Sequence, residues 1–172
     1  MKLFSLLTIV VLLFGVIAVD AQDGKTNFSG KWTLNADKSD QGGGGGRGGR
    51  GGGRGMGASK MVIEHDGDKL IVETFRKNRD GDEISTKVTY SLDGKKVKSE
   101  NDRGSSVSVA KWGKDGKTVT IISERTMGRG GQNFTMETSQ IWSMKSNILI
   151  IDSVMSSQRG DRESKAVYDK AK

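Results

Sequence analysis

The sequence predicts an all-β fold, an antiparallel up-and-down barrel of about 8–10 strands. From residue 59 onward, short segments with apolar residues at every second position are separated by Asp-Gly pairs. Such pairs are typical of tight turns, in which glycine takes a positive φ. Proline is absent, which suits continuous hydrogen-bonded strands. Because a meander of this length would expose two edges in an open sheet, a closed barrel is favoured, with a two-sheet β-sandwich as the alternative.

The period-two pattern is clearest in residues 83–92, where Ile84, Val88 and Tyr90 alternate with polar residues. A strand with this pattern buries one face and exposes the other. The turn pairs are Asp66-Gly67, Asp80-Gly81, Asp93-Gly94 and Asp115-Gly116. Between them we expect strands near residues 30–35, 60–66, 69–77, 83–92, 95–101, 105–113, 117–126, 132–144, 147–156 and 162–169.

Residues 1–21 have the parts of a cleavable secretory signal peptide. Lys2 precedes an apolar run over residues 3–19, and Val19 and Ala21 suit the −3 and −1 positions of the cleavage site. The alternative is an uncleaved membrane anchor, since the run is close to the shortest stretch that spans a bilayer. No basic stop-transfer cluster follows, so we expect cleavage after Ala21 and a secreted or periplasmic protein without a stable membrane span.

The mature chain, residues 22–172, has the length of a single domain, and we expect it to be a monomer. It has no cysteine, so no disulfide can stabilise it in an oxidising compartment and the stability must come from packing. The net charge of +7 favours solubility and loose attraction to polyanions.

Residues 41–58 interrupt the strand pattern with a glycine-rich segment that contains Arg47, Arg50 and Arg54. Too few side chains are present to bury any surface, so a flexible loop is predicted. The glycine-spaced arginines are similar to RGG segments, which bind polyanions through charge and arginine stacking. A solvated linker whose arginines maintain solubility is the alternative interpretation.

Residues 28–35, Phe-Ser-Gly-Lys-Trp-Thr-Leu-Asn, followed by Lys38 and Ser39, resemble the opening strand of lipocalin-like proteins. This broad calycin-type group includes the lipocalins and the fatty-acid-binding proteins. Small secreted bacterial proteins of lipocalin-like type also often end in Val-Tyr-Asp-Lys, as residues 167–170 do here. The resemblance implies a closed antiparallel barrel, with Trp32 packed across one end and Gly30 allowing a close backbone approach.

This sequence departs from the group in three places. The Thr-Asp-Tyr motif of true lipocalins is missing. The glycine-rich segment stands where fatty-acid-binding proteins have a helical lid. Their Arg-x-Tyr carboxylate clamp would fall on Ala166, Val167 and Tyr168, so its arginine is lost. A fatty-acid role does not follow from the resemblance.

Aromatic and methionine side chains on the expected strands are the candidate ligand-binding residues: Trp112, Trp142, Phe134, Met136 and Tyr90. An aromatic lining can hold an apolar molecule inside a barrel, and methionine adapts to irregular ligands. The same residues would equally serve as core, because a barrel of eight strands can fill its interior with side chains.

No nucleophile elbow, P-loop or dinucleotide-binding motif occurs, and we expect neither an enzyme nor a bound cofactor. His65 is the single histidine, and a zinc site needs more nitrogen or sulfur ligands, so no metal is predicted. Glutamates on the expected strands could form an acid–base pair, but their spacing gives this no support: Glu64, Glu73, Glu83, Glu124 and Glu137.

The sequence therefore predicts an exported lipocalin-like protein that binds a small apolar or amphiphilic molecule in the interior of its barrel. The alternative is an extracellular or surface interaction protein whose glycine- and arginine-rich loop contacts polyanions.

Overall fold

The computed structural model describes residues 24–40, 58–78, 80–101, 104–129, 132–158 and 160–171. The expected signal peptide, residues 1–21, lies outside this part of the chain. So do residues 41–57 with Arg47, Arg50 and Arg54, and the roles expected of them stay predictions.

The described chain forms one antiparallel sheet of ten strands, which confirms the all-β barrel. The strands are β1 (Gly30–Leu34), β2 (Lys60–Asp66), β3 (Lys69–Lys77), β4 (Glu83–Ser91), β5 (Asp93–Asn101), β6 (Gly104–Trp112), β7 (Thr118–Arg129), β8 (Gln132–Lys145), β9 (Ile148–Ser157) and β10 (Gly160–Lys170). A short 3-10 turn, η1 (Ala36–Lys38), follows β1. These bounds agree with the expected strands to within a few residues.

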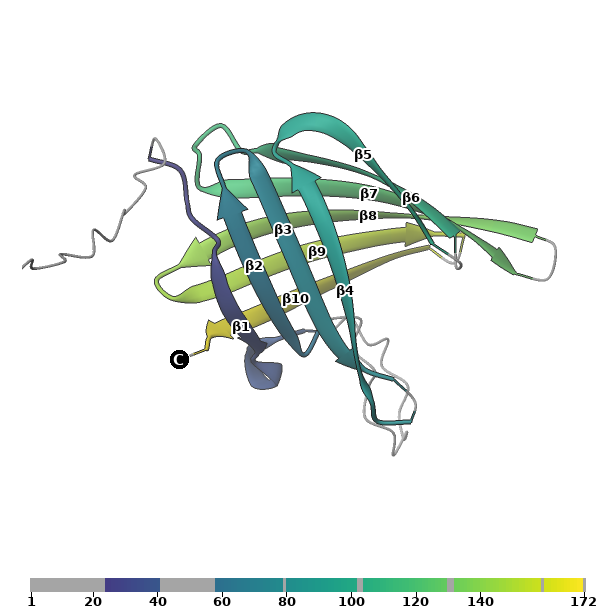
Figure 1. Ribbon diagram of the computed structural model, residues 1–172, viewed down its shortest axis with the longest axis horizontal. Helices are drawn as coiled ribbons and strands as arrows, with labels where there is room; N and C mark the ends of the chain where they lie inside the picture. Colours follow the sequence, from purple (N-terminus) through teal and green to yellow (C-terminus); the bar gives the residue numbers. More distant parts are fainter. Residues whose placement is uncertain are drawn as a thin grey trace, which may run out of the picture.

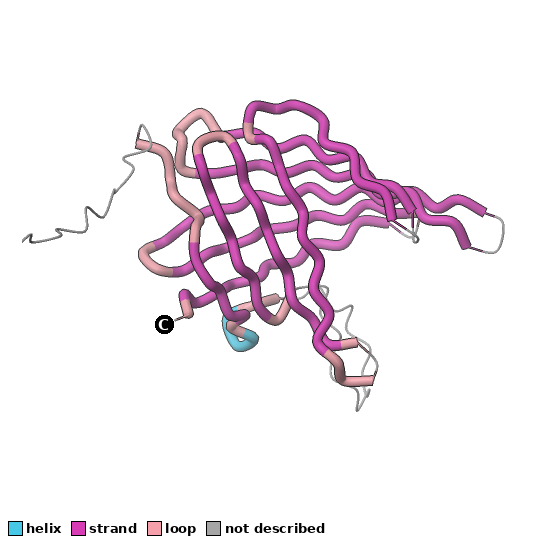
Figure 2. The backbone as a smooth tube through the Cα atoms, viewed as in Figure 1, coloured by secondary structure: helices cyan, strands magenta, loops and turns pink. Residues whose placement is uncertain are grey.

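Pairing of the first strand with the last curls the sheet into a nearly closed barrel. The strand order is β4-β3-β2-β1-β10-β9-β8-β7-β6-β5, so β1 is hydrogen-bonded to both β2 and β10. In Figure 1, β1 to β4 run steeply across the front while β5 to β10 run behind them, and Figure 2 shows how little of the described chain is loop. A single continuous sheet excludes the two-sheet sandwich.

The β4–β5 connection differs from expectation, because Asp93 and Gly94 do not form a hairpin. β4 and β5 are the two ends of the strand order and are not hydrogen-bonded to each other. Leu92 is buried in the core, and the Asp93 carboxylate accepts hydrogen bonds from Ser91 Oγ and from the Lys95 N–H. With Gly94 at a φ of 81° and a register shift between Asp93 and Lys96, the chain turns away from β4 and pairs with β6. An opening therefore remains between β4 and β5.

The hydrophobic core lies at one end of the barrel, the core end, where the β2–β3, β4–β5, β6–β7 and β8–β9 connections meet (Figure 1). The four hairpins that start with β3, β5, β7 and β9 form the opposite, far end. The buried core residues are Phe28, Trp32, Met61, Ile63, Leu70, Val72, Leu92, Ala110, Val119, Ile121, Trp142, Leu149, Ile151 and Tyr168.

Phe28, just before β1, is the centre of this core. Its ring is fully buried and lies 6.0 Å from the Trp112 ring, 6.4 Å from Trp142 and 5.9 Å from His65. The Phe28 carbonyl accepts a hydrogen bond of 3.1 Å from the indole N–H of Trp32. The segment before β1 therefore crosses the core end, and Phe28 contacts β2, β6 and β8 through its ring and β1 through its carbonyl.

The two residues singled out in the opening strand lie beside this cluster. Trp32 is buried, and the Lys170 ammonium lies 5.6 Å from its ring centroid. Gly30 has a φ of 148°, and a Cβ there would lie 3.0 Å from Cε of Lys170. The absence of a side chain at Gly30 thus makes room for the cation above Trp32.

Phe28→Ala should lower the free energy of unfolding by about 3–5 kcal/mol, since it leaves a cavity among aromatic rings that cannot collapse. Urea unfolding followed by tryptophan fluorescence measures this. Ile122→Ala is the control, because Ile122 is 40% exposed and should cost less than about 1 kcal/mol. Equal losses in the two variants would contradict the central place of Phe28.

His65 is held in the core as a neutral imidazole. Its Nδ1 accepts the backbone N–H of Phe28 at 3.3 Å, and its Nε2 lies 3.1 Å from the Gly67 carbonyl, to which it donates. Burial lowers the pKa of His65, and the nearby Lys25 ammonium acts in the same direction, while the Gly67 hydrogen bond and the carboxylates of Asp66 and Asp68 oppose the shift. Both ring nitrogens are occupied, so neither is available to bind a metal.

The fold should lose stability as the pH falls from 7 to 5. A histidine whose pKa is lower in the folded state than in the unfolded chain takes up its proton on unfolding, so its stabilising effect is present above about pH 6.5 and is lost in acid. Unfolding free energies measured at several pH values check this. His65→Asn keeps a hydrogen-bond acceptor near the Nδ1 position. In this variant the free energy of unfolding should fall less between pH 7 and pH 5 than in the unmodified protein. An unchanged pH dependence of the unfolding free energy would contradict the assignment of this effect to His65.

Candidate functional site

The inner face of the barrel is packed at the core end and only half covered beyond it. Side chains of a strand point alternately inward and outward, so the buried Val119 and Trp142 identify the inner positions of β7 and β8. Farther along the same two strands, the inner residues Met127, Phe134 and Met136 are only half-buried. In Figure 1 the far ends of β7 and β8 project past the front strands, which explains why these side chains are less covered.

A belt of polar side chains separates the two halves of the inner face. Ser108 and Ser123 are hydrogen-bonded through their hydroxyls at 2.9 Å. Gln140 donates to the Ser153 hydroxyl at 3.4 Å and accepts the indole N–H of Trp142 at 3.2 Å. The belt is therefore satisfied within the barrel, as polar groups in an interior must be.

We name the half-covered surface beyond this belt the far inner face. It consists of Arg125, Met127, Phe134, Met136, Met155 and Arg162. Met127 is directly opposite Phe134 and Arg125 opposite Met136 on β7 and β8, while Met155 on β9 is opposite Arg162 on β10. Neighbours directly opposite on one face lie about 4.5–5.5 Å apart at Cβ. Met155 is opposite Thr138 of β8 and diagonal to Met136, within reach of a long side chain, so the surface continues from β8 to β9.

The five residues predicted to bind a ligand do not gather in one place. Trp112 and Trp142 lie in or against the core, within reach of Phe28. Phe134 and Met136 belong to the far inner face. Of the three tryptophans, only Trp112 has a buried N–H without a hydrogen-bond partner among the described residues.

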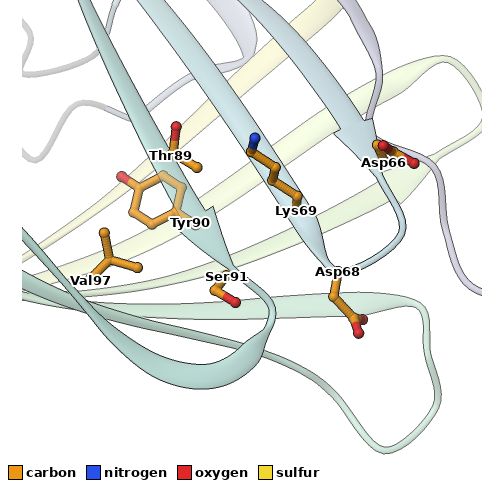
Figure 3. Close-up of a pocket in the computed structure, with 7 residues that line it drawn as sticks. All are labelled: Asp66, Asp68, Lys69, Thr89, Tyr90, Ser91 and Val97. Carbon is orange, nitrogen blue, oxygen red and sulfur yellow. The ribbon is translucent and has the colours of Figure 1, made fainter.

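Tyr90, the fifth of these residues, lies at the opening between β4 and β5. A hollow of about 390 Å³ there is lined by Asp66, Asp68, Lys69, Thr89, Tyr90, Ser91 and Val97. Figure 3 shows the Tyr90 ring on β4 facing Val97 on β5 across the opening. Burial raises the pKa of the Tyr90 hydroxyl, which therefore stays neutral. The hollow is open to the surface and marks where the barrel wall is interrupted.

Sequence reasoning overlooked Arg125 and Arg162. On β7, Arg125 is two inner positions from the buried Ile121. On β10, Arg162 is three inner positions from the buried Tyr168. The period-two pattern could have placed each of them on the buried face of its strand. That the two strands bring them to one surface depends on the pairing of β7 with β8, β8 with β9 and β9 with β10.

No acid–base pair of carboxylates occupies the inner face of the described strands. Each of the glutamates considered from the sequence takes an outer position: Glu64, Glu73, Glu83, Glu124 and Glu137. Within the same part of the chain, no three histidine, aspartate or glutamate side chains are close enough to hold a metal ion. The described residues also contain no helix with the length and apolar character needed to cross a bilayer.

No family model matches the sequence, and neither does any curated protein. Among solved structures, a secretary abundant heat soluble (SAHS) protein from Ramazzottius varieornatus is similar, with a TM-score of 0.50 and 13% identity over 87% of this chain and 98% of that one. A REP1-NXSQ fatty acid transporter has a TM-score of 0.49 and 14% identity over 84% of this chain and 96% of that one. A zebrafish ileal bile acid-binding protein complexed with cholic acid has a TM-score of 0.45 and 11% identity over 84% and 98%.

At such identities a structural likeness concerns the fold alone. Ten antiparallel strands in up-and-down order, closed by the pairing of β1 with β10, are the architecture that the opening strand led us to expect. The likeness to the SAHS protein extends over nearly all of that chain. The chain thus has a lipocalin-like barrel fold.

Proposed function

We propose that the protein is an exported binding protein that holds a small apolar or amphiphilic molecule on the far inner face of its barrel. The observation that carries this is the incomplete burial of an apolar surface that points into the barrel. Phe134, Met136 and Met155 are inward-facing and half-buried, whereas inward-facing residues of the same strands at the core end, Trp142, Leu149 and Ile151, are buried.

Covering this surface would be favourable. Each Å² of apolar surface removed from water is worth about 25 cal/mol, and a small molecule on the far inner face would cover apolar area that no strand covers. Methionine side chains are flexible and polarizable, so Met127, Met136 and Met155 can fit ligands of irregular shape. Phe134 adds a flat ring on which an apolar group can rest.

The core end gives the ligand a rigid support. Phe28 and the three tryptophans surround one end of the barrel, and the belt from Ser108 to Ser153 separates them from the far inner face. We therefore assign Trp112 and Trp142 to the supporting core, and Phe134 and Met136 to direct contact with the ligand. Export depends on residues 1–21 and is tested by the N-terminus of the mature protein.

Titration with 1-pyrenebutanol, a neutral fluorescent amphiphile, tests the proposal. Met136→Asn should weaken binding roughly 5- to 30-fold, since it removes about 1–2 kcal/mol of apolar contact. Energy transfer from tryptophan to pyrene, or the anisotropy of pyrene, measures the affinity. We expect saturable binding of one molecule to the unmodified protein.

Ile141→Asn is the matched control on the same strand. Ile141 is apolar and 48% exposed, but it faces outward, so this change should leave the affinity unaltered. Absence of saturable binding, or equal weakening by the two substitutions, would contradict a ligand site on the far inner face.

A further inference from the structure

We infer that the ligand carries a negative charge and that Arg125 and Arg162 bind its anionic group. This inference rests on the proposed function and specifies the class of its ligand. Charged residues are divided unequally between the two faces of the barrel wall.

No aspartate or glutamate of the described strands takes an inner position. On β7 and β8, Glu124 and Glu137 are opposite each other on the outer face. On β10, Asp161 and Glu163 flank Arg162 and point to the side away from it. Charged residues at inner positions beyond the polar belt are arginines, among them Arg76, Arg125 and Arg162.

The two arginines of the far inner face have no anionic partner within the described residues. No ion pair there involves Arg125 or Arg162, and the carboxylates nearest to them in sequence lie on the other face. Arg125 is half-buried and Arg162 is exposed. A partly covered guanidinium without a counter-ion has five N–H donors available to a ligand.

Their spacing suits a shared anion. Arg125 on β7 is opposite Met136 of β8, and Arg162 on β10 is opposite Met155 of β9. Met155 is itself opposite Thr138, so the two arginines are offset by two residues along the strands. With strands about 4.8 Å apart and an offset of two residues, about 6.8 Å, the two Cα atoms are about 16 Å from each other, a distance that two arginine side chains can close from both sides. Guanidinium groups bind carboxylate, sulfate or phosphate through paired hydrogen bonds.

Polar and apolar neighbours fit the two parts of such a ligand. The hydroxyls of Ser123 and Thr138 take the next inner positions toward the core end and can donate to the same anion. Phe134, Met136 and Met155 would contact the apolar part. This place differs from the fatty-acid-binding clamp, whose arginine position is Ala166 here, because Arg162 lies two inner positions before it on β10.

The test compares 1-pyrenebutyrate with 1-pyrenebutanol, which share the pyrene and the alkyl chain and differ in the anionic group. The unmodified protein should bind the butyrate about tenfold more tightly or better, as expected for a charged hydrogen bond at a partly exposed site. Raising the salt concentration should weaken binding of the butyrate and leave the alcohol unaffected, because salt screens only the charged contact.

Arg125→Gln and Arg162→Gln should each lower the affinity for 1-pyrenebutyrate about tenfold. The affinity for 1-pyrenebutanol should change by less than about twofold. Lys98→Gln is the control: it removes one positive charge from an exposed outer position of β5 and should change neither affinity. Melting temperatures of the variants show whether each substitution leaves the fold intact.

The outcomes separate this inference from the proposed function. Equal affinities for the two probes, with neither arginine variant altering them, would overturn the anionic ligand while the binding site stands. An equal loss of affinity for 1-pyrenebutyrate in all three variants would also overturn the anionic ligand, since the change in net charge alone would then explain the effect. If neither probe binds, the proposed function fails as well.

Discussion

The pairing of β1 with β10 is the constraint on which the rest of the structure depends. β1 is five residues long, yet it connects the front strands β2 to β4 with the back strands β5 to β10. So short a strand is not stable through its own hydrogen bonds. It is fixed because Trp32 and the preceding Phe28 are buried among aromatic rings from β6 and β8, and because His65 of β2 accepts the Phe28 N–H. Packing at the core end thus closes the barrel.

Closing the barrel at one end leaves the other end with less to pack against. Four of the back strands, β7 to β10, have ten to fourteen residues, whereas the front strands have nine or fewer. Inward-facing side chains near the far end therefore lack partners across the barrel, which explains the contrast between the buried Trp142 and the half-buried Met136 on the same face of β8. The candidate site follows from this difference in strand length.

Inside the barrel, polarity is arranged in layers. Aromatic and aliphatic side chains fill the core end, hydrogen-bonded hydroxyls and an amide cross the middle, and methionine, phenylalanine and arginine stand beyond. The outer face carries the carboxylates. Such an interior would favour a molecule with an apolar body and a negative charge over a purely apolar one, since an unpaired guanidinium is costly to cover.

The sequence by itself determined the strands and which side chains share a face. The alternation of apolar and polar residues is a local property of each strand, and each Asp-Gly pair marks a turn through its own backbone preference. It also indicated Trp32 as a core residue. Tertiary structure alone decided the rest. Phe28 belongs to the opening motif but precedes the first strand, and only the fold shows its ring as the centre of the core. Asp93 and Gly94 have the pattern of a hairpin, but the burial of Leu92 turns β5 away from β4. Arg125 and Arg162 meet on one surface only through the register of four strands, a long-range property that no local pattern contains.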